Sequence, residues 1–553
     1  MSGLALDQTR TIIDELLAEQ QRLTAVERFA QRHEAQSLDL QAQVYRDLLP
    51  ARGPTEGEQY AFSVDLDACS GCKACVTACH SLNGLDENET WRSVGLLQGD
   101  VDPGGFLQTV TTACHHCIDP ACLNGCPVMA YEKEPVTGIV RHLDDQCIGC
   151  QYCILKCPYD VPKYSHKRGI VRKCDMCAGR LGVNEPPACA QACPNGAISI
   201  TLVKRSTVAS QACEGIFLPG APNPAYTKPT TQYRTRRVLP ARLTSADAHA
   251  LRPAQSHPAL VAMLVLTQLS VGAFCVETLM EGLFPANLMM QLSPVHSAVA
   301  LAVGLLALGT STLHLGRPLS AWRVVIGLRT SWLSREIVVF GFFALLAILN
   351  AVGFWLSPLT RFSSAETGAA VAITGLLGVF CSVMIYHDTR RPFWMGWRSG
   401  FKFFGTTLVL GAAAALFITT GQAMIWHRVA LNGAYDQLTQ FLSGILVVAG
   451  GLKLVLETCT LCQFHRGIPN TLRQTARLMK GELVEITTAR FLLGLVGTMI
   501  LPLAFLVQKP APAFPTLGVT AGIMAFTLLG EWLERHLFFI AVVPDRMPGG
   551  FDA

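Results

Sequence analysis

The chain has 553 residues, of which 50% are hydrophobic and 15% are charged, and its mean hydropathy is +0.34. Soluble domains carry about 25% charged residues, so the composition excludes a purely soluble protein as well as disordered and collagen-like chains. The formal net charge of +4 is too small to indicate nucleic-acid binding. Most cysteines precede residue 215 and the long apolar runs follow residue 257, so a cysteine-rich soluble part precedes a membrane part.

Residues 1–59 form an N-terminal helical extension without cysteine. Its apolar residues have the spacing of an amphipathic helix or two, namely Ile12, Ile13, Leu16, Leu17, Leu23, Val26 and Phe29. We favour a helix packed on its own domain over one that docks a partner subunit. The first 20 residues lack the basic start and apolar core of a signal peptide, so we expect the soluble part to stay in the reducing cytoplasm. Its cysteines should then be metal ligands.

Residues 60–213 contain four groups of four cysteines among short strand-like runs such as 61–64 and 197–200. Three thiolates on a C-x2-C-x2-C turn can reach three irons of one cubane, and the cysteine three residues later points to another cluster. Sixteen thiolates therefore predict four [4Fe-4S] clusters. A zinc ribbon would leave half of each group without a role. The groups are Cys69, Cys72, Cys75 and Cys79; Cys114, Cys117, Cys122 and Cys126; Cys147, Cys150, Cys153 and Cys157; and Cys174, Cys177, Cys189 and Cys193.

Residues 214–257 are rich in Pro, Thr and Arg and are expected to form a linker that lies on the first domain. Residues 258–553 then contain eight apolar segments near the roughly 20 residues that a membrane-spanning helix needs. The predicted segments are 259–280, 292–313, 336–357, 367–387, 404–426, 437–458, 490–508 and 515–543.

The loops between these segments alternate in positive charge. By the positive-inside rule, the basic loops place both termini and the cysteine groups on the cytoplasmic side of a bacterial-type inner membrane. The loops on that side carry Arg234, Arg236, Arg237, Arg242 and Arg252; Arg317, Arg323, Arg329 and Arg335; Arg390, Arg391, Arg398 and Lys402; and Arg466, Arg473, Arg477, Lys480 and Arg490. The opposite loops carry only Arg361, Arg428 and Lys509.

The order of the cysteine groups, with the gaps in CHHCIDPACLNGCP and CDMCAGRLGVNEPPACAQACP, resembles the iron–sulfur subunit of the dimethyl sulfoxide reductase family of complex iron–sulfur molybdoenzymes. The resemblance spans about residues 60–205 and implies an α+β doubled bacterial-ferredoxin fold. It also implies crossed cluster sets: Cys69, Cys72, Cys75 and Cys193; Cys174, Cys177, Cys189 and Cys79; Cys147, Cys150, Cys153 and Cys126; and Cys114, Cys117, Cys122 and Cys157.

The second half is similar to the all-α, eight-helix membrane anchor of that family through STLHLGRPLSA (311–321), LSREI (333–337) and EWLERHLFF (531–539). The resemblance implies that His314 belongs to a site for menaquinone or ubiquinone. Histidine exchanges protons near neutral pH, as quinone chemistry requires, although a lone histidine at a helix end can also be merely solvated. Arg317, Arg335 and Glu336 are weaker candidates for the same pocket.

Other ionisable residues of the membrane half have two interpretations. Lys453 and Glu457 share a helix face and, with Glu277 and Glu531, form either structural pairs or a proton path, of which we favour pairing. The last apolar segment is long enough to project beyond the hydrocarbon, so its charged residues Glu534 and Arg535 are expected in the headgroup region.

Two further cofactor questions concern the membrane half. Cys459 and Cys462 form a C-x2-C pair outside the four groups and are expected to be apolar filling rather than a redox or metal site. A haem b would need histidines that face one another, for which His314 and His387 would serve. Haem is not expected, because the anchor that the sequence resembles has none.

The sequence therefore predicts an electron-transfer and anchor subunit, with the substrate chemistry on a partner chain. The resemblance implies that this partner contains molybdopterin. Electrons would flow from quinol to an S- or N-oxide, or in reverse from a cytoplasmic substrate such as sulfite to quinone. The alternatives are a ferredoxin–quinone module without a molybdenum partner and a non-redox membrane scaffold.

Overall fold

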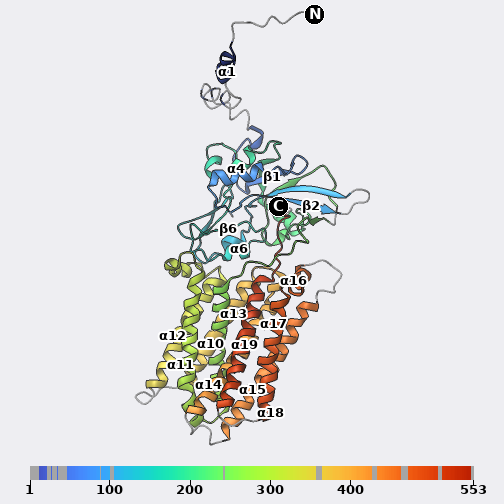
Figure 1. Ribbon diagram of the computed structural model, residues 1–553. Helices are drawn as coiled ribbons and strands as arrows, with labels where there is room; N and C mark the ends of the chain where they lie inside the picture. Colours follow the sequence, from blue (N-terminus) through green and yellow to red (C-terminus); the bar gives the residue numbers. More distant parts are fainter. Residues whose placement is uncertain are drawn as a thin grey trace, which may run out of the picture.

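The computed structural model has a part built of short strands and helices above a bundle of long helices (Figure 1). It describes residues 11–21, 27, 31, 34, 46–87, 89–99, 105–240, 243–356, 364–425, 433–462, 471–508 and 514–549. Several residues used above lie outside these ranges, namely Leu23, Val26, Phe29, Arg242, Arg361, Arg428, Arg466 and Lys509.

Two strands from opposite ends of the cysteine-rich segment form the central ladder of the upper part. Strand β1 (Glu58–Asp65) pairs antiparallel with β8 (Ile198–Lys204), and Phe62 lies opposite Ile200. Apolar side chains of both strands are buried, as expected where one face of a sheet covers a core. These are the two strand-like runs expected from the sequence. Their pairing brings the first and the fourth cysteine groups together.

Shorter elements complete this ferredoxin-like part. The predicted linker lies along it, because β9 (Gln232–Arg234) adds to β1 in parallel and β10 (Thr244–Ser245) pairs with β2. The other strands form three antiparallel pairs: β2 (Ser93–Gly99) with β3 (Phe106–Thr112), β4 (Tyr131–Lys133) with β5 (Val140–His142), and β6 (Lys163–Ser165) with β7 (Ile170–Arg172). The helices are α4 (Ala74–Asn83), α5 (Ala121–Asn124), α6 (Tyr152–Lys156), α7 (Ala178–Leu181), α8 (Ala188–Gln191) and α9 (Arg205–Cys213).

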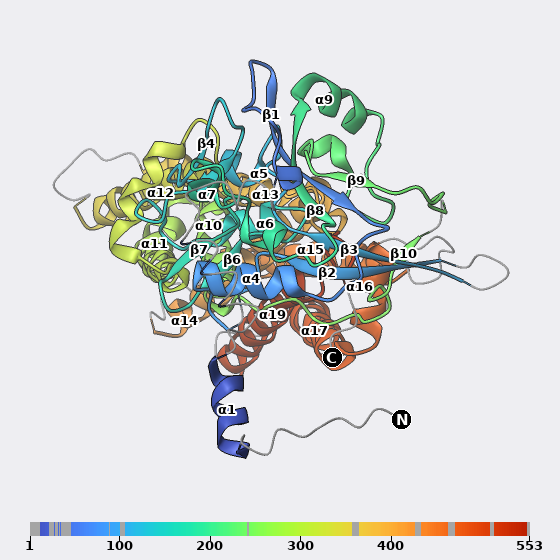
Figure 2. The ribbon, with the colours of Figure 1, turned by 90° about the horizontal axis from the view of Figure 1, so that it is seen from above.

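Within the described residues, eight helical segments are long and apolar enough to cross a membrane. The predicted class, a ferredoxin-like part followed by an eight-helix bundle, is thus confirmed. The segments are α10 (Pro258–Leu283), α11 (Ala286–Ser311), α12 (Trp332–Leu356), α13 (Ser364–His387), α14 (Gly396–Ile425), α15 (Ala434–Leu461), α17 (Val484–Leu495) continued by a π-helical turn (Val496–Ile500) into α18 (Leu501–Gln508), and α19 (Phe514–Ile540). Seen from above, the strands cover one end of this bundle (Figure 2).

The loops at that end of the bundle contact the ferredoxin-like part directly. In the connection from α11 to α12, the amide of Arg317 donates to the Ile148 carbonyl at 3.0 Å. After α13, Asp388 pairs with Lys156 at 2.6 Å between Oδ2 and Nζ. Three predicted basic loops, including that of α16 (Thr471–Lys480), therefore lie on the ferredoxin-like side (Figure 1).

Helix α1 (Ile12–Gln21) stands away from the rest of the structure (Figures 1 and 2). Its apolar side chains Ile12 and Ile13 are 77% and 67% exposed, and Leu16 and Leu17 are also exposed. The favoured expectation that this helix packs on its own domain is therefore wrong for the described turns. Amphipathic spacing alone does not say which surface an apolar face meets.

Gly316 gives a test of the junction between the two parts. A Cβ on Gly316 would lie 1.9 Å from the Gly169 carbonyl oxygen, so the backbones must separate. We expect Gly316→Ala to destabilise the junction by about 1–3 kcal/mol, as overpacking does, and to lower its thermal transition. Gly309→Ala is the matched control, since its Cβ would meet nothing within 4 Å. Equal transitions for the two variants would contradict the close contact.

Candidate functional site

The cysteine loops of the first and third groups have the same backbone. Gly71 and Gly149, each just before the second cysteine, have φ of +76° and +72°, where a Cβ would be strained. Lys73 and Gln151 follow with φ of 62° and 60° and precede α4 and α6. This turn folds three cysteines of each group around one space. The fourth cysteine lies a turn further on, at the helix or its end.

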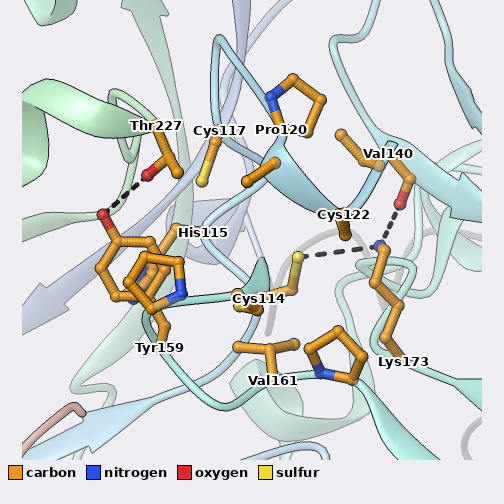
Figure 3. A pocket seen from close by; sticks show the side chains of 14 residues that line it. Cys114, His115, Cys117, Pro120, Cys122, Val140, Tyr159, Val161, Lys173 and Thr227 are labelled. Atoms are coloured by element: carbon orange, nitrogen blue, oxygen red, sulfur yellow. Dashed lines mark hydrogen bonds between the residues drawn. The ribbon is translucent and has the colours of Figure 1, made fainter. Parts of the chain in front are cut away.

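Two cavities are lined by cysteines from more than one group. One, with about 290 Å³ of space between protein atoms, is lined by Cys69, Cys72, Cys75 and Cys193, which we name site A. The other, with about 380 Å³, is lined by Cys114, Cys117, Cys122 and Cys157, which we name site C. Figure 3 shows Cys114, Cys117 and Cys122 around the second cavity. Each cavity combines three cysteines of one group with the last cysteine of another.

The other eight cysteines form two similar sets, which we name site B (Cys79, Cys174, Cys177 and Cys189) and site D (Cys126, Cys147, Cys150 and Cys153). Cys79 is within electrostatic reach of Cys177 and Cys189. Cys126 is within reach of Cys147 and of Cys150. At sites A and C the structure thus brings together two of the cysteine sets that the family resemblance implies, and the cysteines of the other two sets lie near one another.

The four sites follow one another in a row. Cys189 of site B is within electrostatic reach of Cys75 of site A, which places these sites next to each other. Cys114 of site C is likewise within electrostatic reach of Cys174 of site B, which places these two sites next to each other. These two neighbour relations indicate that the three sites lie in the order A, B, C.

Site D lies at the membrane end of this row. Tyr131 is within electrostatic reach of both Cys122 of site C and Cys153 of site D. Site D shares a buried apolar cluster with Leu315 and Val324 from the loop between α11 and α12. The row therefore runs from site D on the bundle through C and B to site A.

The donor set and its burial fit iron–sulfur clusters. Burial raises the pKa of Cys79 to about 12 and that of Cys157 to about 11, so these thiols become thiolates only beside a strong positive charge. Bound metal supplies such a charge. Four thiols around one cavity, as at sites A and C, are the donor set that a cubane cluster takes.

The four predicted quinone residues are not joined into one hydrogen-bonded group. His314 ends the 3-10 turn η3 (Thr312–His314) and is partly buried. Arg317 donates to the Asp144 carbonyl at 2.8 Å. Arg335 donates instead to loop carbonyls ahead of α12. Glu336 is 3% exposed and accepts from the hydroxyl of Ser382. Arg317, Arg335 and Glu336 thus form hydrogen bonds with three different parts of the protein.

Tyr152 connects the helix of site D with α13 and was missed from the sequence. It lies beside Cys153 on α6, is buried, and donates to the Ile385 carbonyl of α13 at 3.0 Å. Glu336 is within electrostatic reach of its phenol. The spacing of the cysteines carries no signal for Tyr152, because its role depends on contact with another part of the protein.

A cluster of charged side chains is buried between α14, α15, α17 and α19. Lys453 and Glu457 are 3.6 Å apart, as their spacing predicts, but each has a second partner. Lys453 also pairs with Glu531, and Arg490 lies 2.9 Å from Glu457 and 3.0 Å from Glu531. The ion pairs thus connect three helices, α15, α17 and α19, and are more than the single pair that the spacing predicts.

Glu534 and Arg535 belong to the same cluster and are buried inside the bundle, while their expected depth in the headgroup region stays a prediction. They are 2% and 0% exposed. Glu534 pairs with Lys402 at 3.3 Å, and Arg535 donates to the side chain of Gln268 at 3.0 Å. A charge at the end of a long apolar helix can enter the protein interior when partners on other helices neutralise it.

Two smaller expectations have different outcomes. Glu277 is buried on α10, as expected for an intramembrane carboxyl. Cys459 and Cys462 are both exposed at the end of α15, and their expected role as apolar filling stays a prediction. The end of α15 faces outward here.

Comparison with known families agrees with this geometry. Residues 255–540, more than half of the sequence, match the family of the DMSO reductase anchor subunit (DmsC), and residues 106–203 match a 4Fe-4S dicluster domain. This protein belongs to the DmsC anchor family. In it, an iron–sulfur domain is fused ahead of the multi-pass membrane anchor.

Individual relatives match the iron–sulfur domain. The B subunit of the anaerobic dimethyl sulfoxide reductase of Haemophilus influenzae is 36% identical over 146 residues, which are 25% of this chain and 71% of the relative. The hydrogenase-2 operon protein HybA of Escherichia coli O157:H7 is 35% identical over 161 residues, 24% of this chain and 49% of HybA, so this chain spans about half of HybA. The formate dehydrogenase-O iron–sulfur subunit of Escherichia coli K12 is 34% identical over 172 residues, 28% of this chain and 57% of the relative. The ferredoxin-like part of this chain is therefore similar to subunits of a dimethyl sulfoxide reductase and of a formate dehydrogenase.

The crossed cysteine sets can be tested by single substitutions. We expect Cys69→Ser and Cys193→Ser to abolish the same electron paramagnetic resonance signal, because both line site A. Cys79→Ser should abolish a different one, and each should cost up to about four of sixteen irons. Cys213→Ser, at an exposed cysteine outside the four sites, is the control. Different signals lost in Cys69→Ser and Cys193→Ser would refute the crossed sets.

Proposed function

We propose that sites A to D each hold one [4Fe-4S] cluster and that the protein passes electrons between membrane quinone and a catalytic partner. Such clusters accept and release single electrons. The cavities at sites A and C support one cluster in each, and the row of four sites supports a continuous path. The observation that carries the proposal is the packing of site D on the bundle.

The proposed quinone site lies at the same end of the bundle, between η3 and the start of α12. Oxidation of a quinol releases two electrons and two protons, so the site needs groups that accept protons as well as a nearby electron acceptor. His314 and Glu336 are the proton acceptors of this proposal. Arg317 and Arg335 hold the loop that covers site D, and act as positioning residues. Menaquinone and ubiquinone both present the carbonyl groups that such a site would bind.

The proposed catalytic partner binds at the outer end of the row, near site A, where Cys72 is exposed. We infer a molybdopterin-containing subunit, because the relatives include subunits of a dimethyl sulfoxide reductase and of a formate dehydrogenase. The basic loops on the ferredoxin-like side favour a cytoplasmic location for the clusters, the partner and both termini. Both directions of net electron flow use this path.

Quinol-driven reduction of the clusters tests the membrane end of the path. We expect His314→Ala and Glu336→Gln to slow this reduction at least tenfold, because each removes a proton acceptor, while chemical reduction by dithionite stays complete. Glu281→Gln is the matched control, since this carboxyl lies at the opposite end of α10. Stopped-flow absorbance of the purified complex measures the rate. Unchanged rates in both test variants would refute this quinone site.

Metal analysis of the native complex tests the partner. Purified anaerobically in mild detergent, the complex should contain about one molybdenum per sixteen to twenty irons, since a partner can add one more cluster. Iron without molybdenum or tungsten, in a complex shown to be intact, would contradict a molybdopterin subunit. It would instead support a ferredoxin–quinone module with another electron partner.

A further inference from the structure

Arg92 is a buried cation that none of the described ion pairs includes. Its residue is 2% exposed, and its guanidinium lies 4.7 Å from the ring centre of Phe62. Nη1 donates to the Thr111 hydroxyl at 3.2 Å, and that hydroxyl is 3.6 Å from Sγ of Cys75. In the described part of the protein, Nε and Nη2 have no hydrogen-bond partner. A buried charge of this kind is costly unless an anion compensates it.

The groups that surround Arg92 are cysteines of two different sites, whose thiols become thiolates when metal binds. Burial lowers the pKa of the guanidinium, but the thiolates outweigh burial and raise it. These thiolates are Cys75 of site A and Cys79, Cys174 and Cys189 of site B. Arg92 therefore occupies the junction between sites A and B.

Lys173 occupies the next junction. It is 3% exposed, lines the cavity of site C, and has Nζ 3.7 Å from Sγ of Cys114 (Figure 3). The same ammonium donates to the carbonyl of Cys174 in site B at 2.8 Å and to that of Val140. Asp175 is within electrostatic reach, but the described ion pairs do not include Lys173. Sites B and C thus share one cation.

Arg172, a neighbouring buried cation of the ferredoxin-like part, is neutralised by an ion pair with a carboxylate. Its Nη1 lies 3.1 Å from Oε2 of Glu89, and Nη2 donates to the Asn83 carbonyl at 2.9 Å. Arg172 and Glu89 therefore contribute no net charge. Arg92 and Lys173 differ from this pair, because their compensating groups are the sulfur sites themselves.

We infer that Arg92 and Lys173 are fixed positive charges at successive junctions of the electron path, where each raises the reduction potentials of the two clusters beside it. This inference rests on the proposed clusters. Reduction adds one electron, and hence one negative charge, to a site without taking up a proton. A nearby cation in a low-dielectric interior stabilises that added charge. Site B is beside both cations and site D is beside neither.

The inference predicts a pattern across four measured potentials. In Arg92→Met the potentials of sites A and B fall, and in Lys173→Met those of sites B and C fall. One potential therefore falls in both variants and one falls in neither. We expect at least a tenfold shift of each affected equilibrium toward the oxidised form, which is about 59 mV for a one-electron couple. Arg92→Lys and Lys173→Arg keep the charge and should recover most of the shift.

Redox titration of the purified complex, followed by electron paramagnetic resonance, measures these potentials. The control is the double variant Glu89→Gln with Arg172→Gln, which removes a buried pair of zero net charge and should leave all four potentials in place. Iron content is measured first. Fewer than four clusters in the unaltered complex would overturn the proposed function and this inference with it. Unchanged potentials in iron-replete Arg92→Met and Lys173→Met would overturn the inference alone.

If one charge-removing variant loses iron, the inference can still be tested. The charge-retaining variant at the same position then tests the charge, because iron restored by Arg92→Lys or Lys173→Arg supports a cation requirement at that junction. The other methionine variant, which keeps its iron, is then used to measure the reduction potentials of the two clusters beside its position. If its two expected potentials stay unchanged, the inference is wrong.

Discussion

The division of each cysteine group between two sites is the constraint on which the rest of the structure depends. Cys193 reaches the loop of Cys69 only because β1 and β8 pair along their length. On α4, Cys75 faces site A while Cys79 faces site B, so one short helix serves two sites. The pairing of the strands, the position of α4 and the composition of the sites therefore depend on one another. A row of neighbouring sites follows directly from this sharing.

The membrane bundle meets the row at one end and contains its own charges elsewhere. Around site D the contacts are apolar packing, the Tyr152 hydroxyl and the pair between Lys156 and Asp388. The charged cluster around Glu531 lies between other helices, where Glu531 pairs with both Lys453 and Arg490. Under the proposed function, the charged cluster and the electron path occupy different regions of the anchor. Asp388, paired with Lys156 of α6, is a carboxyl that connects the two parts.

The cysteine spacing and the apolar segments predicted most of the architecture, because thiolate geometry and bilayer thickness each require a fixed spacing along the sequence. Arg92 and Lys173 had no such signal, since a lone basic residue near a cysteine is ordinary in any soluble domain. The burial of Glu534 and Arg535 had no such signal for a related reason, because it depends on partners far away in sequence. The exposed face of α1 shows the same limit, because periodicity defines an apolar face but not its partner.

The order in which electrons enter the row tests the central claim most directly. The complex is mixed rapidly with quinol, frozen at successive times and examined by electron paramagnetic resonance. Signals are assigned to sites by their loss in Cys150→Ser for site D and Cys72→Ser for site A. The account predicts that the site D signal appears first. A site A signal that appears as early as that of site D, or earlier, would contradict entry from the membrane.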